Sequence, residues 1–194
     1  MEERTLVLLK PDSVKRHISG KIISRFEDTG LKIIAMKMVW ANDELAKEHY
    51  KLDEEWAMNV FNKTKAVYEK EGKEMRYQNH LEWGRIIQMH NMTFLMKGPV
   101  IAMIWEGPHA IELVRKMIGA TEPRSALSGT IRGDFASVES YPVADANSRV
   151  VRNLVHASDS VKNAEREISL WFRPEEIHNH KTVYDLTLPD KKDY

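Results

Sequence analysis

The sequence predicts one domain of mixed α/β class, because apolar strands and amphipathic helices alternate along it. Four short stretches are apolar enough to form buried strands, and a helical pattern of apolar residues follows each of them. The 194 residues are enough for one domain with a substantial core. Hydrophobic residues make up 42% of the chain and charged residues 30%, which indicates a globular and not a disordered protein.

The first half of the chain contains two strand–helix units. Residues 5–9 are apolar on both faces and predict a buried central strand, which Pro11 ends because proline cannot continue a sheet ladder. Apolar residues at helical spacing predict a helix over 19–29. A second strand is expected over 31–41, and a helix follows the capping residue Asn42.

Residues 51–92 separate these units from the second half. This segment is rich in Lys and Glu, and we expect a pair of helices broken near Gly72. A third strand over 100–105 is expected to end at residues 106–108, and a helix over 109–118 follows.

A turn-rich segment over 121–149 carries Arg132. A loop of this length in a compact domain is usually functional, although Arg132 could equally form a surface ion pair with Asp134. The fourth strand ends at His156, and a helix is expected over 161–172. Because the free N–H groups of a helix N-terminus suit phosphate, His156 lies where a histidine can act on a phosphoryl group.

Two topologies fit this order of elements. One is a parallel doubly wound sheet, and the other is an antiparallel sheet of the ferredoxin-like type with helices on one face. The chain has no GxGxxG motif after its first strand and no GxxxxGK[ST] motif. A nucleotide would therefore be bound without a glycine-rich phosphate loop.

Composition excludes several classes of function. The chain has no cysteine, which excludes disulfides, thiolate catalysis and cysteine-based zinc sites. Basic and acidic residues number 29 each, so no global field favours nucleic acid or a membrane surface, and we expect no specific nucleic-acid partner. No apolar run reaches the roughly 18 residues that span a membrane, and we find no signal peptide, so a cytoplasmic protein is expected.

Six motifs together resemble those of nucleoside diphosphate kinases. GTIRGD (129–134) and NLVHASDS (153–160) are the most specific in combination. Arg115 and Thr121 fall at the matching spacing between motifs, and the resemblance covers most of the chain outside 51–92 and the tail. The other four motifs are KPD (10–12), EHY (48–50), GPVIAM (98–103) and AEREI (164–168).

With this resemblance we expect the antiparallel topology, a ferredoxin-like four-stranded sheet covered by helices. Residues 1–194 would form a single nucleoside diphosphate kinase domain, with an inserted helical segment at 51–92 and a C-terminal extension at 177–194.

The resemblance implies transfer of the γ-phosphate of ATP to a nucleoside diphosphate, by a ping-pong mechanism through a phosphohistidine on His156. A neutral imidazole has a lone pair that can attack phosphorus, provided that its other nitrogen is held as a donor. In the family a glutamate of the following helix does this, here Glu167, with Ser158 supporting the glutamate and Tyr50 packing beside the histidine. Taken alone, Glu167 could be a surface residue and Tyr50 a half-buried amphipathic one.

The resemblance also implies the groups that hold the nucleotide. Lys10, Arg115 and Arg132 would clamp the phosphates, since arginine forks pair with phosphate oxygens and lysine supplies a mobile point charge. Thr121 would add a hydroxyl group, and Asn153 together with Lys10 would hold the sugar hydroxyls. Taken alone, Lys10 could be an ordinary strand-end lysine on the surface.

The expected cofactor is Mg²⁺, bridging the phosphates of the substrate and contacting the protein mainly through water near Asp159. Family members are generally hexamers built from dimers. We therefore expect a homo-oligomer, with a hexamer favoured and a dimer or tetramer as alternatives. Since no base-reading group is evident, nucleoside di- and triphosphates with different bases are the expected partners.

The chain departs from the common family pattern at several places. Ala157 and Ser13 stand where the family often has glycine, and the longer stretch 137–152 looks like the archaeal branch. Counting back from Gly98 puts Ile87 where the family has an aromatic residue that stacks on the base. The insertion offers four aromatic candidates for that role: Phe61, Tyr68, Tyr77 and Trp83.

Three other functions compete with this interpretation. A phosphohistidine carrier that serves a protein would not need a nucleotide clamp such as Lys10, Arg115 and Asn153. A catalytically silent interaction module would need neither His156 nor Glu167 for packing. Specific nucleic-acid binding is opposed by the zero net charge.

Overall fold

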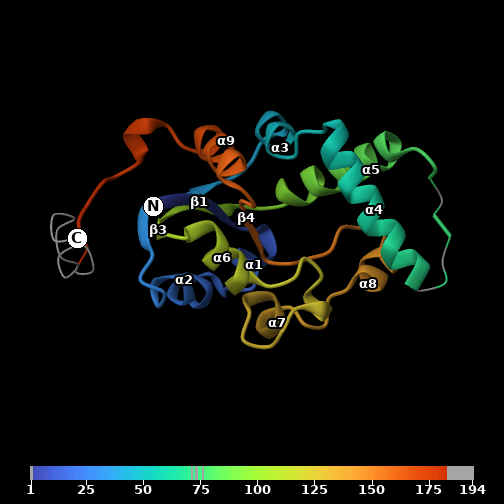
Figure 1. Cartoon of the computed structure of the whole chain (residues 1–194), viewed down its shortest axis with the longest axis horizontal. Helices are drawn as coiled ribbons and strands as arrows, with labels where there is room; N and C mark the ends of the chain where they lie inside the picture. Colours follow the sequence, from blue (N-terminus) through green and yellow to red (C-terminus); the bar gives the residue numbers. More distant parts are fainter. Residues whose placement is uncertain (1, 71, 73, 76, 183–194) are drawn as a thin grey trace, which may run out of the picture.

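A four-stranded antiparallel sheet forms the centre of the molecule (Figure 1). In the computed structural model the spatial order is β2-β3-β1-β4, and all neighbouring strands are antiparallel. The ferredoxin-like topology is confirmed and the parallel alternative is wrong. The structure describes residues 2–70, 72, 74–75 and 77–182, so the outer part of the extension 177–194 lies outside the described residues. The strands are β1 (Glu2–Leu9), β2 (Lys32–Val39), β3 (Val100–Pro108) and β4 (Val155–Ala157).

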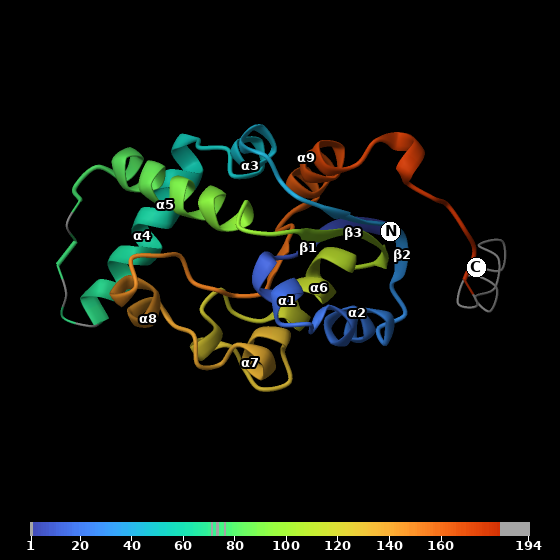
Figure 2. The same cartoon turned by 180° about the vertical axis from the view of Figure 1, so that it is seen from behind.

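Helices cover both faces of the sheet, because β1 is apolar on both sides. Val7 and Leu9 of β1 belong to one core cluster, and Leu6 and Leu8 belong to the other. The element count fitted an antiparallel sheet with helices on one face, and that part of the expectation is therefore wrong. Figures 1 and 2 show α2 (Ser19–Glu27) and α6 (Ala110–Ile118) on one side, and α3 (Asp43–His49) and α9 (Val161–Trp171) on the other.

The third strand is longer than predicted. Glu106 and Gly107 continue the ladder of β3 by pairing with Arg4 and Glu3 of β1. Pro108 closes the strand opposite Glu2, at a strand end where its missing N–H does not interrupt the ladder. The strand therefore ends at Pro108, three residues later than the predicted end at residue 105.

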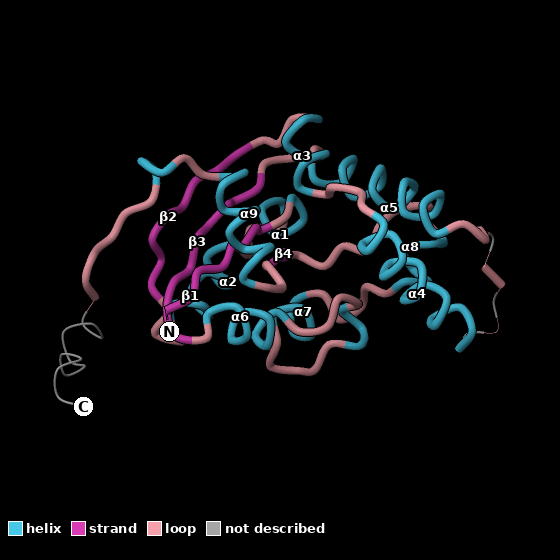
Figure 3. Tube along the Cα trace, turned by 45° about the horizontal axis from the view of Figure 1, so that its top comes forward, coloured by secondary structure: helices cyan, strands magenta, loops and turns pink. Residues whose placement is uncertain are grey.

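Segment 51–92 contains two packed helices, α4 (Glu54–Lys70) and α5 (His80–Leu95), at the end of the molecule away from β2 (Figure 3). Their axes approach closely at Gly84, where an added Cβ would lie 2.9 Å from the Cβ of Ala57. The indole Nε1–H of Trp83 donates to the Thr64 hydroxyl at 3.1 Å. The break near Gly72 is as predicted, and α5 extends three residues past the expected end of the segment.

The segment 121–149 is less irregular than predicted. It contains the 3-10 turn η1 (Pro123–Ser125) and two short helices, α7 (Ile131–Phe135) and α8 (Tyr141–Ala146). The Thr130 side chain caps α7 by accepting from the Gly133 N–H at 3.1 Å. The expected alternative of an Arg132–Asp134 ion pair is wrong, because Asp134 pairs with Arg25 of α2.

Two short elements complete the described chain. Helix α1 (Pro11–Lys15) follows β1 directly, with Pro11 at its first position, and η2 (Pro174–Glu176) follows α9. Beyond η2 the His178 N–H donates to the Ile34 carbonyl at the edge of the sheet, at 2.8 Å. None of the helices in the described part of the chain is long and apolar enough to cross a membrane.

Candidate active site

His156 lies in β4, the short edge strand, directly before the N-terminus of α9. It stands opposite Leu8 of the buried strand β1. Five residues later the chain enters α9, whose N-cap is Ser160, with its hydroxyl accepting from the Asn163 N–H at 3.2 Å. The side chain of His156 is 23% exposed, so a substrate can reach it.

Glu167 of α9 holds one nitrogen of His156. Its Oε2 lies 2.9 Å from Nε2 of the histidine and accepts the Ser158 hydroxyl at 2.7 Å. Burial alone would raise the pKa of Glu167, but His156 and these hydrogen bonds outweigh burial and lower the pKa to about 2. The carboxylate is therefore ionised at neutral pH and accepts the Nε2 proton, which leaves the lone pair of His156 on Nδ1.

Lys10 and Asn153 form a buried polar pair beside this histidine. Lys10 Nζ donates to Asn153 Oδ1 at 2.8 Å, and Asn153 Nδ2 donates to the Thr121 carbonyl at 2.9 Å. Burial, and next the charge of Arg132, lower the pKa of Lys10 to about 8. Asn153 thus joins the end of β1 to the start of the segment 121–149.

Arg132 is buried and binds three backbone carbonyls. Its Nε, Nη1 and Nη2 donate to the carbonyls of Asn153, Gly119 and Val155, at 3.1, 2.8 and 2.6 Å. A guanidinium has five N–H donors, so two remain for a ligand. Burial and the neighbouring charge of Arg115 lower the pKa of Arg132 to about 10, which leaves it charged at neutral pH.

Arg115, Thr121 and Asp159 are exposed, unlike Lys10 and Arg132. Arg115 and Asp159 line one cavity of about 380 Å³ between α6 and the start of α9. Asp159 Oδ1 accepts from the Asn163 side chain at 2.7 Å. Of these residues, Thr121 is joined to Asn153 through its carbonyl, and Arg115 is close enough for its charge to lower the pKa of Arg132.

The ring of Tyr50 is connected to that of His156 through the intervening ring of His49. The ring centroids of Tyr50 and His49 are 4.7 Å apart, and those of His49 and His156 are 4.6 Å apart. Burial raises the pKa of the Tyr50 phenol, which is therefore neutral. Sequence reasoning placed Tyr50 beside the histidine and gave His49 no role, although both belong to the same EHY motif.

Comparisons with known proteins identify the family. A model of the nucleoside diphosphate kinase family matches residues 3–71 and 54–177. The nucleoside diphosphate kinase of Pyrobaculum aerophilum is 46% identical over 179 residues, which cover 90% of this chain and 97% of that protein. That of Pyrococcus furiosus is 43% identical over 190 residues, covering 98% and 95%. The chain belongs to the nucleoside diphosphate kinase family.

Solved structures of nucleoside diphosphate kinases have the same fold. A crystal structure of the enzyme from Pyrobaculum aerophilum matches with a TM-score of 0.87 and 44% identity, covering 92% of this chain and 100% of that one. A transition-state mimic from Borrelia burgdorferi, with bound vanadate and ADP, matches with a TM-score of 0.76 and 35% identity, covering 93% of each chain. The predicted resemblance is confirmed, and the chain is an enzyme that transfers the γ-phosphate of a nucleoside triphosphate to a nucleoside diphosphate.

One group of side chains in the described part of this kinase has the composition of a metal site. Ligand atoms of His49, His156 and Glu167 lie within 4.8 Å of one another. Two imidazoles and one carboxylate do not suit Mg²⁺, which prefers oxygen ligands and retains water. The exposed carboxylate of Asp159, beside Arg115, suits a hydrated Mg²⁺ better.

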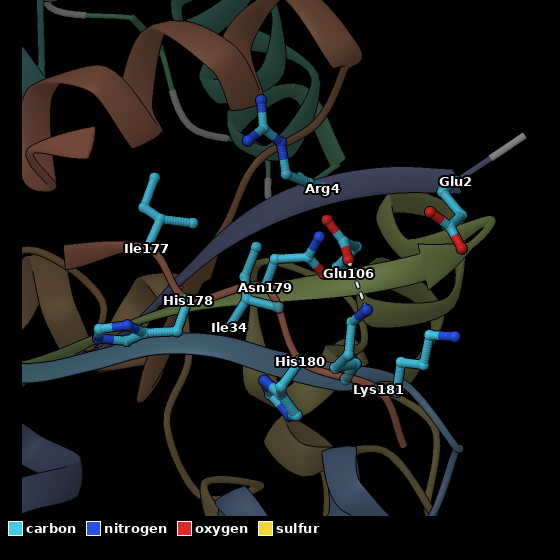
Figure 4. A pocket seen from close by; sticks show the side chains of 10 residues that line it. Glu2, Arg4, Ile34, Glu106, Ile177, His178, Asn179, His180 and Lys181 are labelled. Carbon is cyan, nitrogen blue, oxygen red and sulfur yellow. Dashed lines mark ion pairs between the residues drawn. The ribbon is translucent and has the colours of Figure 1, made fainter. Parts of the chain in front are cut away.

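A second cavity, of about 420 Å³, lies at the opposite end of the strands (Figure 4). Figure 4 shows charged side chains of both signs around it, including Glu2 and Glu106 from the strands and Lys181 from the tail. None of the kinase motif residues that surround His156 lines this cavity. This cavity therefore lacks the residues that the resemblance assigns to the nucleotide.

Three aromatic residues of the insertion make side-chain contacts, two with each other and one with α8. Trp83 packs against Tyr77 with ring centroids 5.3 Å apart, and Tyr68 donates to Asp145 of α8 at 3.2 Å. Ile87 lies on α5 and is half-buried. These contacts give Trp83 and Tyr77 a packing role in the helix pair of this kinase.

Proposed function

We propose that this kinase carries the phosphoryl group on Nδ1 of His156. The Nδ1 lone pair forms a bond to the γ-phosphorus while the bond from that phosphorus to the β–γ bridging oxygen breaks. The electron pair leaves with the nucleoside diphosphate, and a second nucleoside diphosphate takes the phosphoryl group in the reverse step. The observation that carries the proposal is the Nε2–Glu167 hydrogen bond, which directs the lone pair to Nδ1.

Glu167 and Ser158 act on the histidine and not on the nucleotide. When Nδ1 bonds to phosphorus the imidazole ring becomes cationic, and the ionised Glu167 neutralises it through the retained Nε2 proton. Ser158 keeps Oε2 of the glutamate in place. Tyr50 shields the histidine pair through its contact with His49.

The phosphates are held by Lys10, Arg115 and Arg132, because positioning and charge neutralisation dominate phosphoryl transfer. Arg132 offers two unused N–H donors on a guanidinium already fixed by three carbonyls. Thr121 contributes its exposed hydroxyl, and Asn153 holds the sugar hydroxyls together with Lys10. The structure of a relative with bound vanadate and ADP supports a nucleotide site of this kind in the family.

The proposal includes Mg²⁺ as cofactor. When bound to the substrate phosphates, Mg²⁺ would neutralise part of their charge. Asp159 would accept hydrogen bonds from its waters, since this carboxylate is exposed and shares a cavity with Arg115.

We also propose a homo-oligomer, with a hexamer favoured over a dimer or tetramer. The edge strand β2 and the residue after it expose three large apolar side chains, Met36, Met38 and Trp40, which are 57%, 62% and 67% exposed. Leu127 and Val138 of the segment 121–149 are also exposed. Exposed apolar residues along an edge strand favour pairing with a second copy.

The domain organisation is part of the same proposal. Residues 1–194 form one domain, with 51–92 as an inserted helical segment and 177–194 as a C-terminal extension. Support comes from the family model, which matches in two stretches that overlap within α4 and stops at residue 177. A cytoplasmic location is included because ATP and GDP are made and used there.

The test uses purified protein, magnesium and γ-labelled ATP. Wild type is expected to take up acid-labile label that GDP removes as GTP, whereas His156→Ala takes up none. Label that forms but ignores every nucleoside diphosphate would favour the protein phosphocarrier. Nucleotide binding without label would favour a silent module, and label on His156→Ala would overturn the assignment of His156.

A further inference from the structure

His49 is buried beside the phosphoryl acceptor, and the mechanism above gives it no task. It is the last residue of α3, and its side chain is 4% exposed. Three aromatic rings surround it: Tyr50, the next residue of the chain, His156 from β4 and Trp171 from the end of α9. A polar ring in so apolar a position needs a physical reason.

Trp171 fixes which nitrogen of His49 carries the proton. The indole Nε1–H of Trp171 donates to Nδ1 of His49 at 3.2 Å, so the proton of the neutral ring lies on Nε2. That Nε2 is buried and has no hydrogen-bond partner among the described residues. Burial, and next the proximity of His156, lower the pKa of His49 well below its ordinary value, which keeps the ring uncharged.

His49 stands edge-to-face against His156. Their centroids lie 4.6 Å apart and their planes meet at 83°, a favourable arrangement for aromatic rings. The His156 ring is therefore restrained in two ways, by the hydrogen bond from Nε2 to Glu167 and by the packed ring of His49. A rotation of the His156 ring about its Cβ–Cγ bond would break both contacts, and it is this rotation that would turn Nδ1 away from a phosphate.

We propose that His49, anchored by Trp171, is a positioning residue that holds the ring of His156 with Nδ1 directed at the phosphorus. The proposal rests on the proposed function, since it assumes that His156 accepts the phosphoryl group. His49 acts through the histidine and does not contact the nucleotide.

For this positioning role the ring of His49 has to be uncharged. The N–P bond forms with the His156 lone pair, the bridging P–O bond breaks toward the nucleoside diphosphate, and the Nε2 proton stays on His156 against Glu167. The His156 ring then carries a positive charge that Glu167 neutralises. A second cation 4.6 Å away would oppose this charge, whereas the neutral His49 does not.

The test compares substitutions that separate the ring of His49 from its polarity. His49→Phe keeps an aromatic ring without a nitrogen. His49→Gln fills part of the volume and keeps a hydrogen-bond acceptor for Trp171, but has no ring. His49→Ala removes both. His180→Ala, at an exposed histidine of the tail, is the matched control.

Each variant is mixed with excess γ-labelled ATP, and the single-turnover rate of His156 labelling is followed across ATP concentrations. His49→Ala and His49→Gln are expected to lower the maximal rate by about 10²-fold, the loss typical of a misplaced reacting group. The ATP concentration at half-maximal rate should change less than about twofold, because His49 does not touch the nucleotide. His49→Phe should restore the rate to within about fivefold of wild type, and His180→Ala should match wild type.

Several outcomes would overturn the proposal. One is a wild-type rate in His49→Ala, and another is a rate for His49→Phe as low as that of His49→Ala. If His49→Ala does not fold, the labelling rates of His49→Phe and His49→Gln are compared. A higher rate for His49→Gln than for His49→Phe refutes the positioning role. A wild-type protein that takes up no label would refute the proposed function instead, so the two failures are distinguishable.

Discussion

Lys10 Nζ and Asn153 Oδ1 lie 2.8 Å apart in a buried part of the molecule, and this contact joins the end of β1 to a residue two positions before β4. Burial disfavours the charged form of Lys10. The amide nitrogen of Asn153 donates to the Thr121 carbonyl. Burial of the Lys10 ammonium therefore costs stability and holds this cation beside Asn153.

The first prediction concerns the pH dependence of stability through Lys10. Its pKa is lowered from 10.5 to about 8 in the folded protein, so the unfolded chain binds more protons between these values. The free energy of unfolding of wild type should therefore rise relative to Lys10→Met by on the order of 3 kcal/mol between pH 8 and 10.5. Urea unfolding at both pH values measures this, and a constant difference between the two proteins would contradict it.

The second prediction concerns Glu167, whose pKa is lowered from 4.5 to about 2. A depressed carboxyl pKa contributes stability above pH 4.5, and this stability is lost as pH falls toward 2. Wild type should lose on the order of 3 kcal/mol over this window that Glu167→Gln does not lose. Unfolding of both proteins is compared at pH 6 and pH 3, where about 2 kcal/mol of this loss should be measured, with Glu55→Gln on the exposed start of α4 as control. Equal pH slopes for wild type and Glu167→Gln would be the contrary result.

The third prediction separates two arginines of the clamp. Arg132→Ala orphans three carbonyls and should destabilise the fold by about 3 kcal/mol, whereas exposed Arg115→Ala should change stability by less than about 0.5 kcal/mol. Both should lower the rate of phosphoryl transfer by roughly 10²–10³-fold. Calorimetry and a coupled ATP–GDP assay measure the two effects. An Arg132→Ala protein as stable as wild type would show that the carbonyl contacts contribute little.

Much of the site could be predicted because its parts are local in sequence. The strand–turn–helix order around His156 and the spacing to Glu167 bring those two side chains together whatever the rest of the chain does. The capping role of Ser160 is local in the same way. Buried apolar runs likewise predicted all four strands.

What sequence reasoning missed depends on contacts between distant residues. The strand order cannot be derived from apolar runs, because parallel and antiparallel sheets both bury them. Arg132 binds carbonyls of Gly119, Asn153 and Val155 only because the segment 121–149 folds back on β4. His49 meets Trp171 from the far end of the chain, so its motif alone could not reveal that contact.

The fourth prediction concerns Trp83. Its indole packs on Tyr77 and donates to Thr64, so Trp83→Ala should lower stability by about 2 kcal/mol and leave the affinity for ADP unchanged. Thr64→Val, which removes the acceptor for Trp83 and the hydroxyl that donates to the Val60 carbonyl, should cost about 1 kcal/mol. Calorimetric titration with ADP and urea unfolding measure both quantities. Weaker ADP binding by Trp83→Ala at unchanged stability would instead make Trp83 the residue that stacks on the base.

The fifth prediction tests assembly through the edge of the sheet. Met38 on β2 and Met89 on α5 are 62% and 56% exposed, so a charge at either position costs the isolated fold little. Met38→Glu should reduce the mass of the assembly, because a new charge would be buried against its copy in the paired edge strands. Met89→Glu lies away from that edge and should leave the mass unchanged. Light scattering after size-exclusion chromatography gives the masses. A monomeric wild type would refute the homo-oligomer, and an unchanged mass in Met38→Glu would move the interface away from β2.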